Sequence, residues 1–91
     1  MKVIFSEDFF QVYTGDPAAA PGRIESVFNT IEPHVEFVPA KQANRQNIAA
    51  VHSSNHIQFI ENQGLYEIAS LAAGGAIQSA QIGLSEPCFG L

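Results

Sequence analysis

The order of apolar and polar positions along the chain predicts strands and helices in turn. Lys2 to Phe5 is a short apolar run followed by polar residues, which is typical of a buried strand. From Arg23 to Ile31, apolar residues recur with the 3.6-residue period of a helix, and Pro33 should end that helix. Val35 to Val38 alternates apolar and polar residues, which predicts a second strand.

The second half of the chain is mainly helical in pattern. We expect Asn47 to cap a short turn that runs to Val51, and Ser53 or Ser54 to cap a helix that stops at Gly64. A longer helix should cover Tyr66 to Ile82, where apolar residues again recur at helical spacing. Cys88 to Leu91 is a final apolar run and predicts a third strand.

The order strand, helix, strand, helix, helix, strand indicates an α/β domain with a parallel sheet and flanking helices. With 91 residues, 46% of them hydrophobic and 14% charged, the chain should form a single unit over residues 1–91 with its own core. A domain of this size buries only about 60% of the surface of its unfolded chain, so its stability should be marginal without a partner or further chain.

Charge and cysteine content narrow the classes of partner. Four Lys and Arg against nine Asp and Glu give a net charge of −5, which argues against direct nucleic-acid binding. The opening residues contain no signal-peptide apolar region, and no apolar stretch is long enough for a membrane span, so we expect no membrane partner. Cys88 is the single cysteine and has no partner for an internal disulfide, which favours a reducing, cytoplasmic location.

Three histidines are the first candidates for chemistry. His52 and His56 are four residues apart, a spacing that would place both imidazoles on one helix face and could begin a zinc site. Two ligands do not make a site, and the alternative is that both side chains lie at the surface and bond to backbone or solvent. His34 adds no useful spacing.

Other candidates each have an ordinary structural explanation. Glu7 and Asp8 follow the first strand at the edge where parallel sheets bind ligands, yet a solvated strand end explains them as well. Cys88 in an apolar strand is expected to be a buried hydrophobic residue rather than a nucleophile. Gly74-Gly75 lies inside a helical pattern and indicates close packing rather than a phosphate loop. Arg23 at a helix start opposes the helix dipole, so either a specific role or an ordinary surface position fits.

Several segments together resemble the amino-terminal part of the histone deacetylase superfamily, especially its acetylpolyamine amidohydrolase and acetoin-utilization branches. The segments are Met1 to Asp8, Pro21-Gly22-Arg23-Ile24, Val51 to Glu61 and Ala72 to Ala76. The third of these matches the family pattern Val-His-x-x-x-Tyr-[aliphatic]-x-Phe-[aliphatic]-Glu, with His56 where the family usually has tyrosine. The loop before Arg23 lacks the common His-Pro-Glu, and the insertion of the polyamine branch after Gly64 is missing.

The resemblance implies a fold and a parent activity. The fold would be the three-layer arginase/deacetylase-like type, of which this chain would supply the first β-α-β-α-α-β part as an amino-terminal fragment. The parent would be a zinc-dependent deacetylase that hydrolyses an acetyl-amide on acetylated lysine or a polyamine. Arg23 matches the arginine that lines an internal channel in the family. The family's catalytic histidine pair and zinc ligands match no residue here, so no catalytic residue, metal ligand or cofactor is expected in this chain itself.

Two functions therefore follow from the sequence. The first is the scaffold portion of a zinc-dependent deacetylase, which by itself should be inactive. The alternative is a free-standing, non-catalytic α/β module that binds a partner or a small ligand. In either case an uncovered sheet edge should favour a homo-oligomer.

Overall fold

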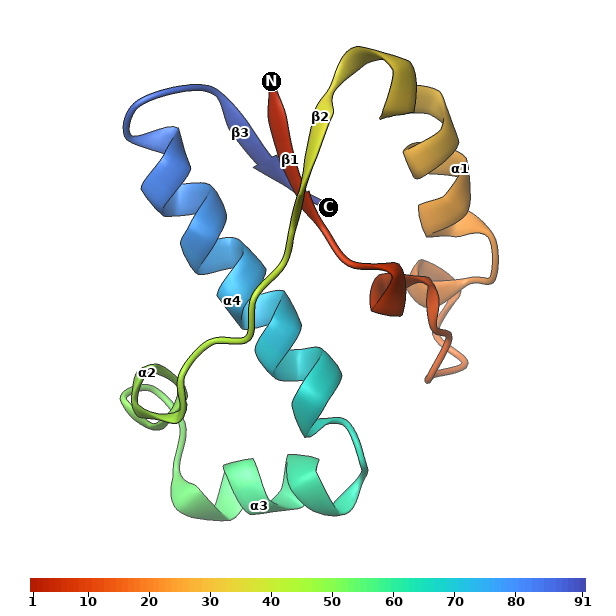
Figure 1. Cartoon of the computed structure of the whole chain (residues 1–91). Coiled ribbons are helices and arrows are strands. Elements are labelled where there is room, and N and C mark those ends of the chain that lie inside the picture. The colour runs from red at the N-terminus through yellow and green to blue at the C-terminus, as the bar shows by residue number, and fades with distance from the viewer.

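The three strands form one parallel sheet at the centre of the molecule. In a computed structural model that describes all residues from 1 to 91, the strands are β1 (Lys2–Phe5), β2 (Glu36–Pro39) and β3 (Cys88–Gly90). Their order is β2-β1-β3, and β1 is parallel to both neighbours. Figure 1 shows β1 between the other two strands. The predicted α/β class with a parallel sheet and flanking helices is confirmed.

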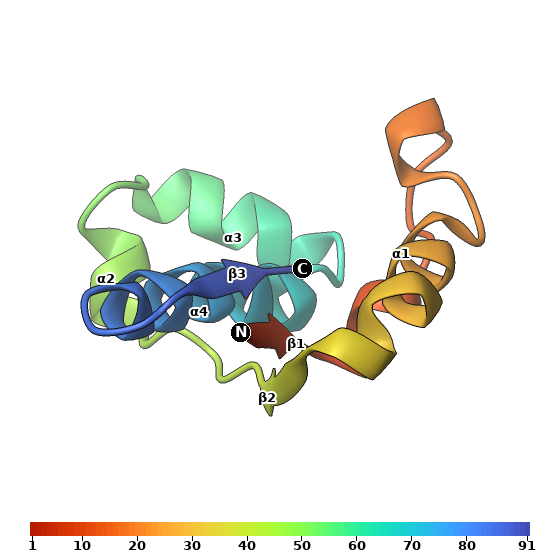
Figure 2. The ribbon, with the colours of Figure 1, turned by 90° about the horizontal axis from the view of Figure 1, so that it is seen from above.

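Four α-helices and three short 3-10 helices connect the strands. The α-helices are α1 (Arg23–Ile31), α2 (Arg45–Ala49), α3 (Ser54–Asn62) and α4 (Tyr66–Gly83), and the 3-10 helices are η1 (Glu7–Phe10), η2 (Pro17–Ala19) and η3 (Glu32–His34). The views in Figures 1 and 2 place α1 and α4 on opposite faces of the sheet. The three layers are therefore α1, the sheet, and α4 together with α2 and α3.

The side chains of β1 point alternately to the two faces of the sheet and belong to the core on both. Val3, Ile4 and Phe5 are all buried, at 0%, 1% and 8% exposure. Successive residues of a strand point to opposite faces. Phe5 therefore packs toward α1, with its ring centroid 4.9 Å from that of Phe28, while Ile4 packs toward Gly75 of α4. Figure 2 shows the central strand between these helices.

An aromatic cluster fills the space between the sheet and α1. The rings of Phe28 in α1 and Phe37 in β2 are stacked, with centroids 4.5 Å apart and planes 8° apart. Phe5 lies 5.7 Å from Phe37, and Phe10 of η1 lies 5.1 Å from Phe5. Such aromatic pairs contribute about 0.5–1.5 kcal/mol beyond the area they bury. The cluster therefore joins α1, η1 and both strands of the first β-α-β unit.

Two glycines of helix α4 let it pack closely against the segment that follows β2 and against β1. A Cβ atom at Gly74 would overlap the carbonyl of Lys41, and it would lie 2.6 Å from the nitrogen of Ala43. The same crossover segment is hydrogen-bonded to Gln78, whose Oε1 accepts from the Lys41 N–H at 2.7 Å and whose Nε2 donates to the Pro39 carbonyl at 3.1 Å. The close packing expected at Gly74-Gly75 is thus against backbone at Gly74 and against the side chains of Ile4 and Ala40 at Gly75.

Several predicted boundaries are confirmed. The first strand, the helix from Arg23 to Ile31 and the Ser53 cap are as expected, since Ser53 Oγ accepts from the His56 N–H at 3.2 Å. The long helix begins at Tyr66 as predicted and extends one residue further, to Gly83. The helix α1 does end before Pro33, as expected, and a separate short helix, η3, then passes through that proline, which is tolerated near a helix start.

Other local predictions are wrong. Asn47 does not cap the short helix, because the side chain of Asn44 accepts from the Asn47 N–H at 2.8 Å and starts α2 earlier. The second strand begins one residue later than expected, at Glu36, where it enters register with Lys2.

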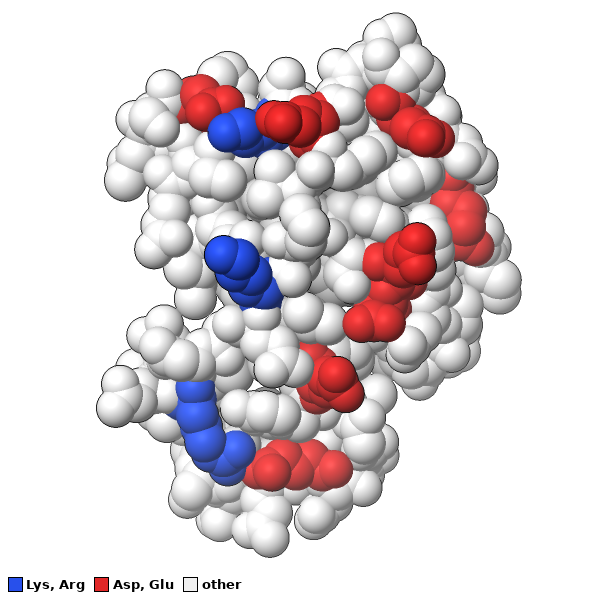
Figure 3. Space-filling model, viewed as in Figure 1, with Lys and Arg blue, Asp and Glu red and all other residues white.

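Acidic and basic side chains are distributed unevenly over the surface. Figure 3 shows acidic side chains alone over the half of the molecule that carries α1, whereas basic ones lie on the other half of that face. Two exposed ion pairs, Lys2 with Glu86 at 3.3 Å and Arg45 with Glu61 at 2.8 Å, neutralise part of this charge. None of the helices combines the length and apolar character that crossing a membrane requires.

Candidate functional site

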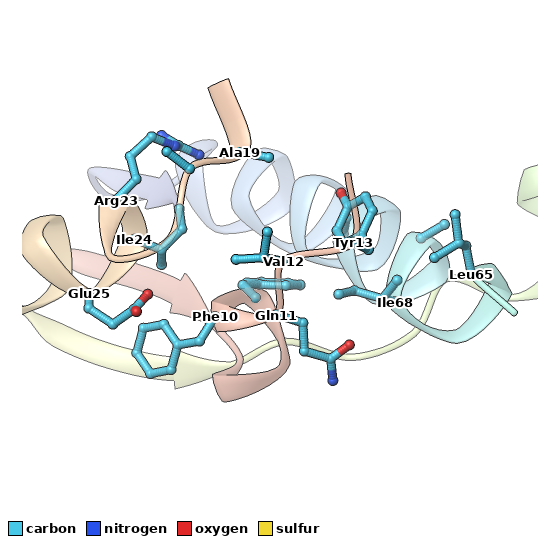
Figure 4. Close-up of a pocket in the computed structure, with 14 residues that line it drawn as sticks. Phe10, Gln11, Val12, Tyr13, Ala19, Arg23, Ile24, Glu25, Leu65 and Ile68 are labelled. Atoms are coloured by element: carbon cyan, nitrogen blue, oxygen red, sulfur yellow. The ribbon is translucent and has the colours of Figure 1, made fainter. Parts of the chain in front are cut away.

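A cavity lies beside the residues that follow β1. It has a volume of about 270 Å³ and is lined by 14 residues, of which 11 are hydrophobic. Figure 4 shows that these come from three places in the chain: the segment after β1, the start of α1 and the start of α4. The carboxyl ends of parallel strands are where open α/β sheets bind ligands. This cavity, here called the Arg23 cavity, is therefore the first candidate site.

Local caps set the position of its walls. Ser6 Oγ accepts from the Asp8 N–H at 3.2 Å and starts η1, so that the chain turns directly after β1. Asp16 Oδ1 accepts from the Ala18 N–H at 2.9 Å and starts η2. Gly22 caps α1 with φ of 83°, a left-handed conformation that favours glycine. These turns bring Arg23 to the cavity wall opposite α4.

Only three lining residues of the Arg23 cavity are polar or charged. They are Gln11, Arg23 and Glu25. Figure 4 shows the Arg23 guanidinium and the Glu25 carboxylate extending in different directions, and neither belongs to an ion pair. Arg23 is exposed and forms no side-chain hydrogen bond within the chain. Its donors are therefore free to bind an acceptor at the cavity edge.

Glu7 and Asp8 lie in a different, more open hollow. This hollow has a volume of about 520 Å³ and lies between the ends of β1 and β2. Both carboxylates occupy the first turn of η1, where negative charge is favourable at the helix start. They do not share the Arg23 cavity, and a helix-start role explains both of them.

His52 and His56 do not share a helix face. Because Ser53 caps α3, His52 lies outside that helix and only His56 belongs to its first turn. The two rings are nevertheless close, with centroids 5.1 Å apart, and both residues line a second cavity of about 370 Å³ between α2, α3 and α4. His34 lies in η3, away from both.

Cys88 is half-buried rather than buried. It begins β3, which is an edge strand and so has a neighbour on one side only. Its position in the sheet pairs it with Lys2.

An aromatic and charged cluster at the surface joins the three helices around the second cavity. Arg45 of α2 donates to Glu61 of α3 and lies 5.3 Å above the ring of Tyr66 in α4. The hydrogen bond and the charge of Glu61 raise the pKa of Arg45 above its ordinary value. Arg45 therefore keeps its positive charge throughout the physiological range.

The donor set does not fit the zinc ion that the sequence resemblance implies. No three or more His, Cys, Asp or Glu side chains gather in a way that could hold a metal ion. A catalytic zinc site needs about three protein ligands and an open position. The side chains of these 91 residues therefore do not form such a zinc site.

The sequence indicated Arg23 but not the cavity around it. The resemblance gave Arg23 a position beside a channel, whereas Gln11, Tyr13 and Leu65 were not singled out. These residues lie in segments without a clear period, so no local pattern marks them. Comparison with known proteins adds no assignment, because no family model, curated protein or solved structure matches the chain.

Proposed function

We propose that this chain forms the amino-terminal scaffold of a larger arginase/deacetylase-like domain whose complete form hydrolyses an acetyl-amide with the help of zinc. The substrate class would be acetylated lysine or an acetylated polyamine. In this proposal the catalytic histidines and metal ligands lie outside these 91 residues. The chain itself supplies the first strands of the sheet and the Arg23 side of a channel.

One observation carries the proposal furthest. Arg23, the residue that the resemblance assigns to a channel, lies at an apolar cavity beside the carboxyl end of β1, with its guanidinium unpaired. An unpaired arginine at an apolar wall suits a channel that is completed by further residues. The free edge of β3 supports the same interpretation, because a parallel sheet can extend from it.

The residues of this chain would act by positioning. Gly22 sets the direction from which Arg23 enters, and Phe28 locks α1 against the sheet through its stacked contact with Phe37. Arg23 would offer fixed donors to a carbonyl, a carboxylate or an ordered water in the channel. Proton transfer at the scissile amide would require groups that these residues do not include.

The test is to sequence the coding DNA downstream of Leu91 and to assay any longer protein that it encodes. In the deacetylase superfamily that the chain resembles, the catalytic histidine pair belongs to an Arg-Pro-Pro-Gly-His-His segment. If the reading frame continues beyond Leu91 into such a segment, the longer protein should hydrolyse acetyl-lysine or acetylpolyamine substrates when loaded with Zn²⁺. The 91-residue chain assayed alongside should show no turnover. A longer protein that lacks the histidine pair, or that carries it and leaves both substrates intact, would refute the proposal.

A second function has its own support in the structure. The Arg23 cavity combines a mostly apolar lining with a few polar groups, as small-molecule sites do. A non-catalytic module that binds a small ligand there would need no further residues. Binding of small ligands by the 91-residue chain, with Arg23→Ala abolishing it, would favour this function over the scaffold.

A further inference from the structure

The second cavity has the composition of a site for a small amphiphilic ligand. Its volume of about 370 Å³ falls within the usual range for ligand pockets, and 10 of its 14 lining residues are hydrophobic. Among the lining residues, Ile57 is only 5% exposed, whereas Val51 is 78% exposed. The cavity therefore has an apolar interior that opens toward solvent.

Few of the residues that line this cavity can carry charge. Among the lining residues only His52, His56 and Tyr66 are titratable, and no Asp, Glu, Lys or Arg lines it. Arg45 lies over the ring of Tyr66, and it forms an ion pair with Glu61 in which the two charges neutralise each other. Positive charge on the histidines would therefore have no carboxylate within the cavity to balance it.

The two imidazoles lie close enough to act on one group. Their ring centroids are 5.1 Å apart and both side chains are exposed at the surface. Two protonated rings at this distance repel each other, and an anion between them would relieve that repulsion. The amide of Asn47 lines the same cavity and offers further hydrogen bonds.

We propose that this cavity binds a small amphiphilic carboxylate, with its hydrocarbon chain inside and its carboxylate between His52 and His56. A divalent metal ion is the less favoured occupant, since no third ligand accompanies the two histidines. The proposal does not depend on the deacetylase scaffold, because the cavity shares only Ala69 with the Arg23 cavity.

The direct test is calorimetric titration of the 91-residue chain with octanoate, 1-octanol and octylammonium at several pH values. Histidine changes charge between pH 5 and 8, so octanoate should bind about tenfold more tightly at pH 5.5 than at pH 8. 1-Octanol should bind with little pH dependence, and octylammonium should bind most weakly. Imidazole resonances of His52 and His56, followed by NMR, should shift with octanoate while those of His34 stay fixed.

Matched variants separate the two parts of the proposed site. The double variant His52→Gln with His56→Gln should remove the pH dependence, whereas His34→Gln should keep it. Ala73→Leu should fill the cavity and weaken octanoate and octanol alike, and Ala80→Leu on the exposed side of the same helix should leave both unchanged. NMR spectra of each variant would establish that it is folded.

Three results would overturn the inference. The first is no binding of octanoate at about 1 mM to the folded chain, a concentration that detects even millimolar affinity. The second is equal binding of octanoate and octanol at every pH, which would mean an apolar cavity without an anion site. The third is a shift of both histidines by Zn²⁺ alone at micromolar concentration together with no response to octanoate, which would assign the pair to a metal ion.

Discussion

Gly74 is the position at which helix α4 tolerates least added volume. A Cβ atom there would meet the backbone at Lys41, Gln42 and Ala43, and backbone cannot rotate away as a side chain can. Gly74→Ala should therefore destabilise the protein by about 3 kcal/mol or more, despite the better helix propensity of alanine. Urea unfolding followed by circular dichroism measures this difference.

Gly75 provides the matched control for that substitution. Its added Cβ would make an ordinary contact with Ile4 at 3.4 Å, so helix propensity decides the sign. Gly75→Ala should be neutral or stabilising by up to about 1 kcal/mol. Equal losses at both positions would show that the segment at Lys41 can move away from α4.

Arg23 should contribute little to stability in this chain. Its side chain is exposed and has no ion pair, and surface substitutions of that kind change the free energy of unfolding by less than about 1 kcal/mol. Phe28→Ala, which removes a stacked ring from the aromatic cluster in the same helix, should cost about 2 kcal/mol or more. Denaturant midpoints for the two variants should differ accordingly, and a loss at Arg23 as large as that at Phe28 would mean that its guanidinium is held by a buried acceptor.

Helix α4 and the crossover segment before α2 depend on each other through Gln78. Its side-chain amide donates to the carbonyl of Pro39, the last residue of β2, and accepts from the N–H of Lys41, two residues further on. Gln78→Ala should cost about 1–3 kcal/mol, because two backbone groups lose their partner. Gln81→Ala, three residues further along the helix at an exposed position, should change stability by less than about 0.5 kcal/mol. Thermal unfolding monitored by calorimetry would detect the difference, and equal melting temperatures for the two variants would contradict it.

Elements whose apolar residues recur with a clear period could be predicted from the sequence. Element boundaries that depend on which nearby residue supplies the cap could not. The helix from Arg23 to Ile31 has the apolar spacing of a single face, and its bounds are as predicted. The start of α2 depends on whether Asn44 or Asn47 supplies the cap, and both are good cap residues, so spacing alone could not choose. His52 and His56 have a helical spacing, but the Ser53 cap places only one of them in a helix.

The candidate sites depend still more on long-range packing. The Arg23 cavity joins residues after β1 to the start of α4, segments far apart in the chain. No local pattern encodes such a meeting, because it results from crossovers that place both segments at one end of the sheet. Of the residues that line the Arg23 cavity, the sequence indicates only Arg23, by its place at a helix start and by the family resemblance.

At the scale of the whole molecule, several large apolar side chains remain exposed. Leu84 is 90% exposed and Phe89 of β3 is 52% exposed, and both sheet edges lack a neighbouring strand. These features favour association through the β3 edge. Light scattering should therefore show dimers or larger species at about 0.1 mM, a concentration that populates modest hydrophobic interfaces.

A pair of lysine substitutions would locate that interface. Phe89→Lys places a charge on the sheet edge and should reduce association, because charged edge strands resist pairing. Phe59→Lys, at a side chain of similar exposure in α3, should leave the mass distribution unchanged. A monomer at every concentration for the unsubstituted chain would refute edge pairing altogether.

The position of β3 has a consequence for the order of folding. Strands β1 and β2 are joined by residues 6–35, which carry α1 and the three 3-10 helices, whereas the pairing of β1 with β3 brings together groups such as Lys2 and Glu86, which are 84 positions apart. Closing so long a loop costs more chain entropy than closing the first unit. The β1-α1-β2 unit should thus assemble early and β3 last. Until β3 arrives, the side of β1 with which it pairs has no neighbouring strand, which makes the docking of β3 the step most open to capture by another molecule.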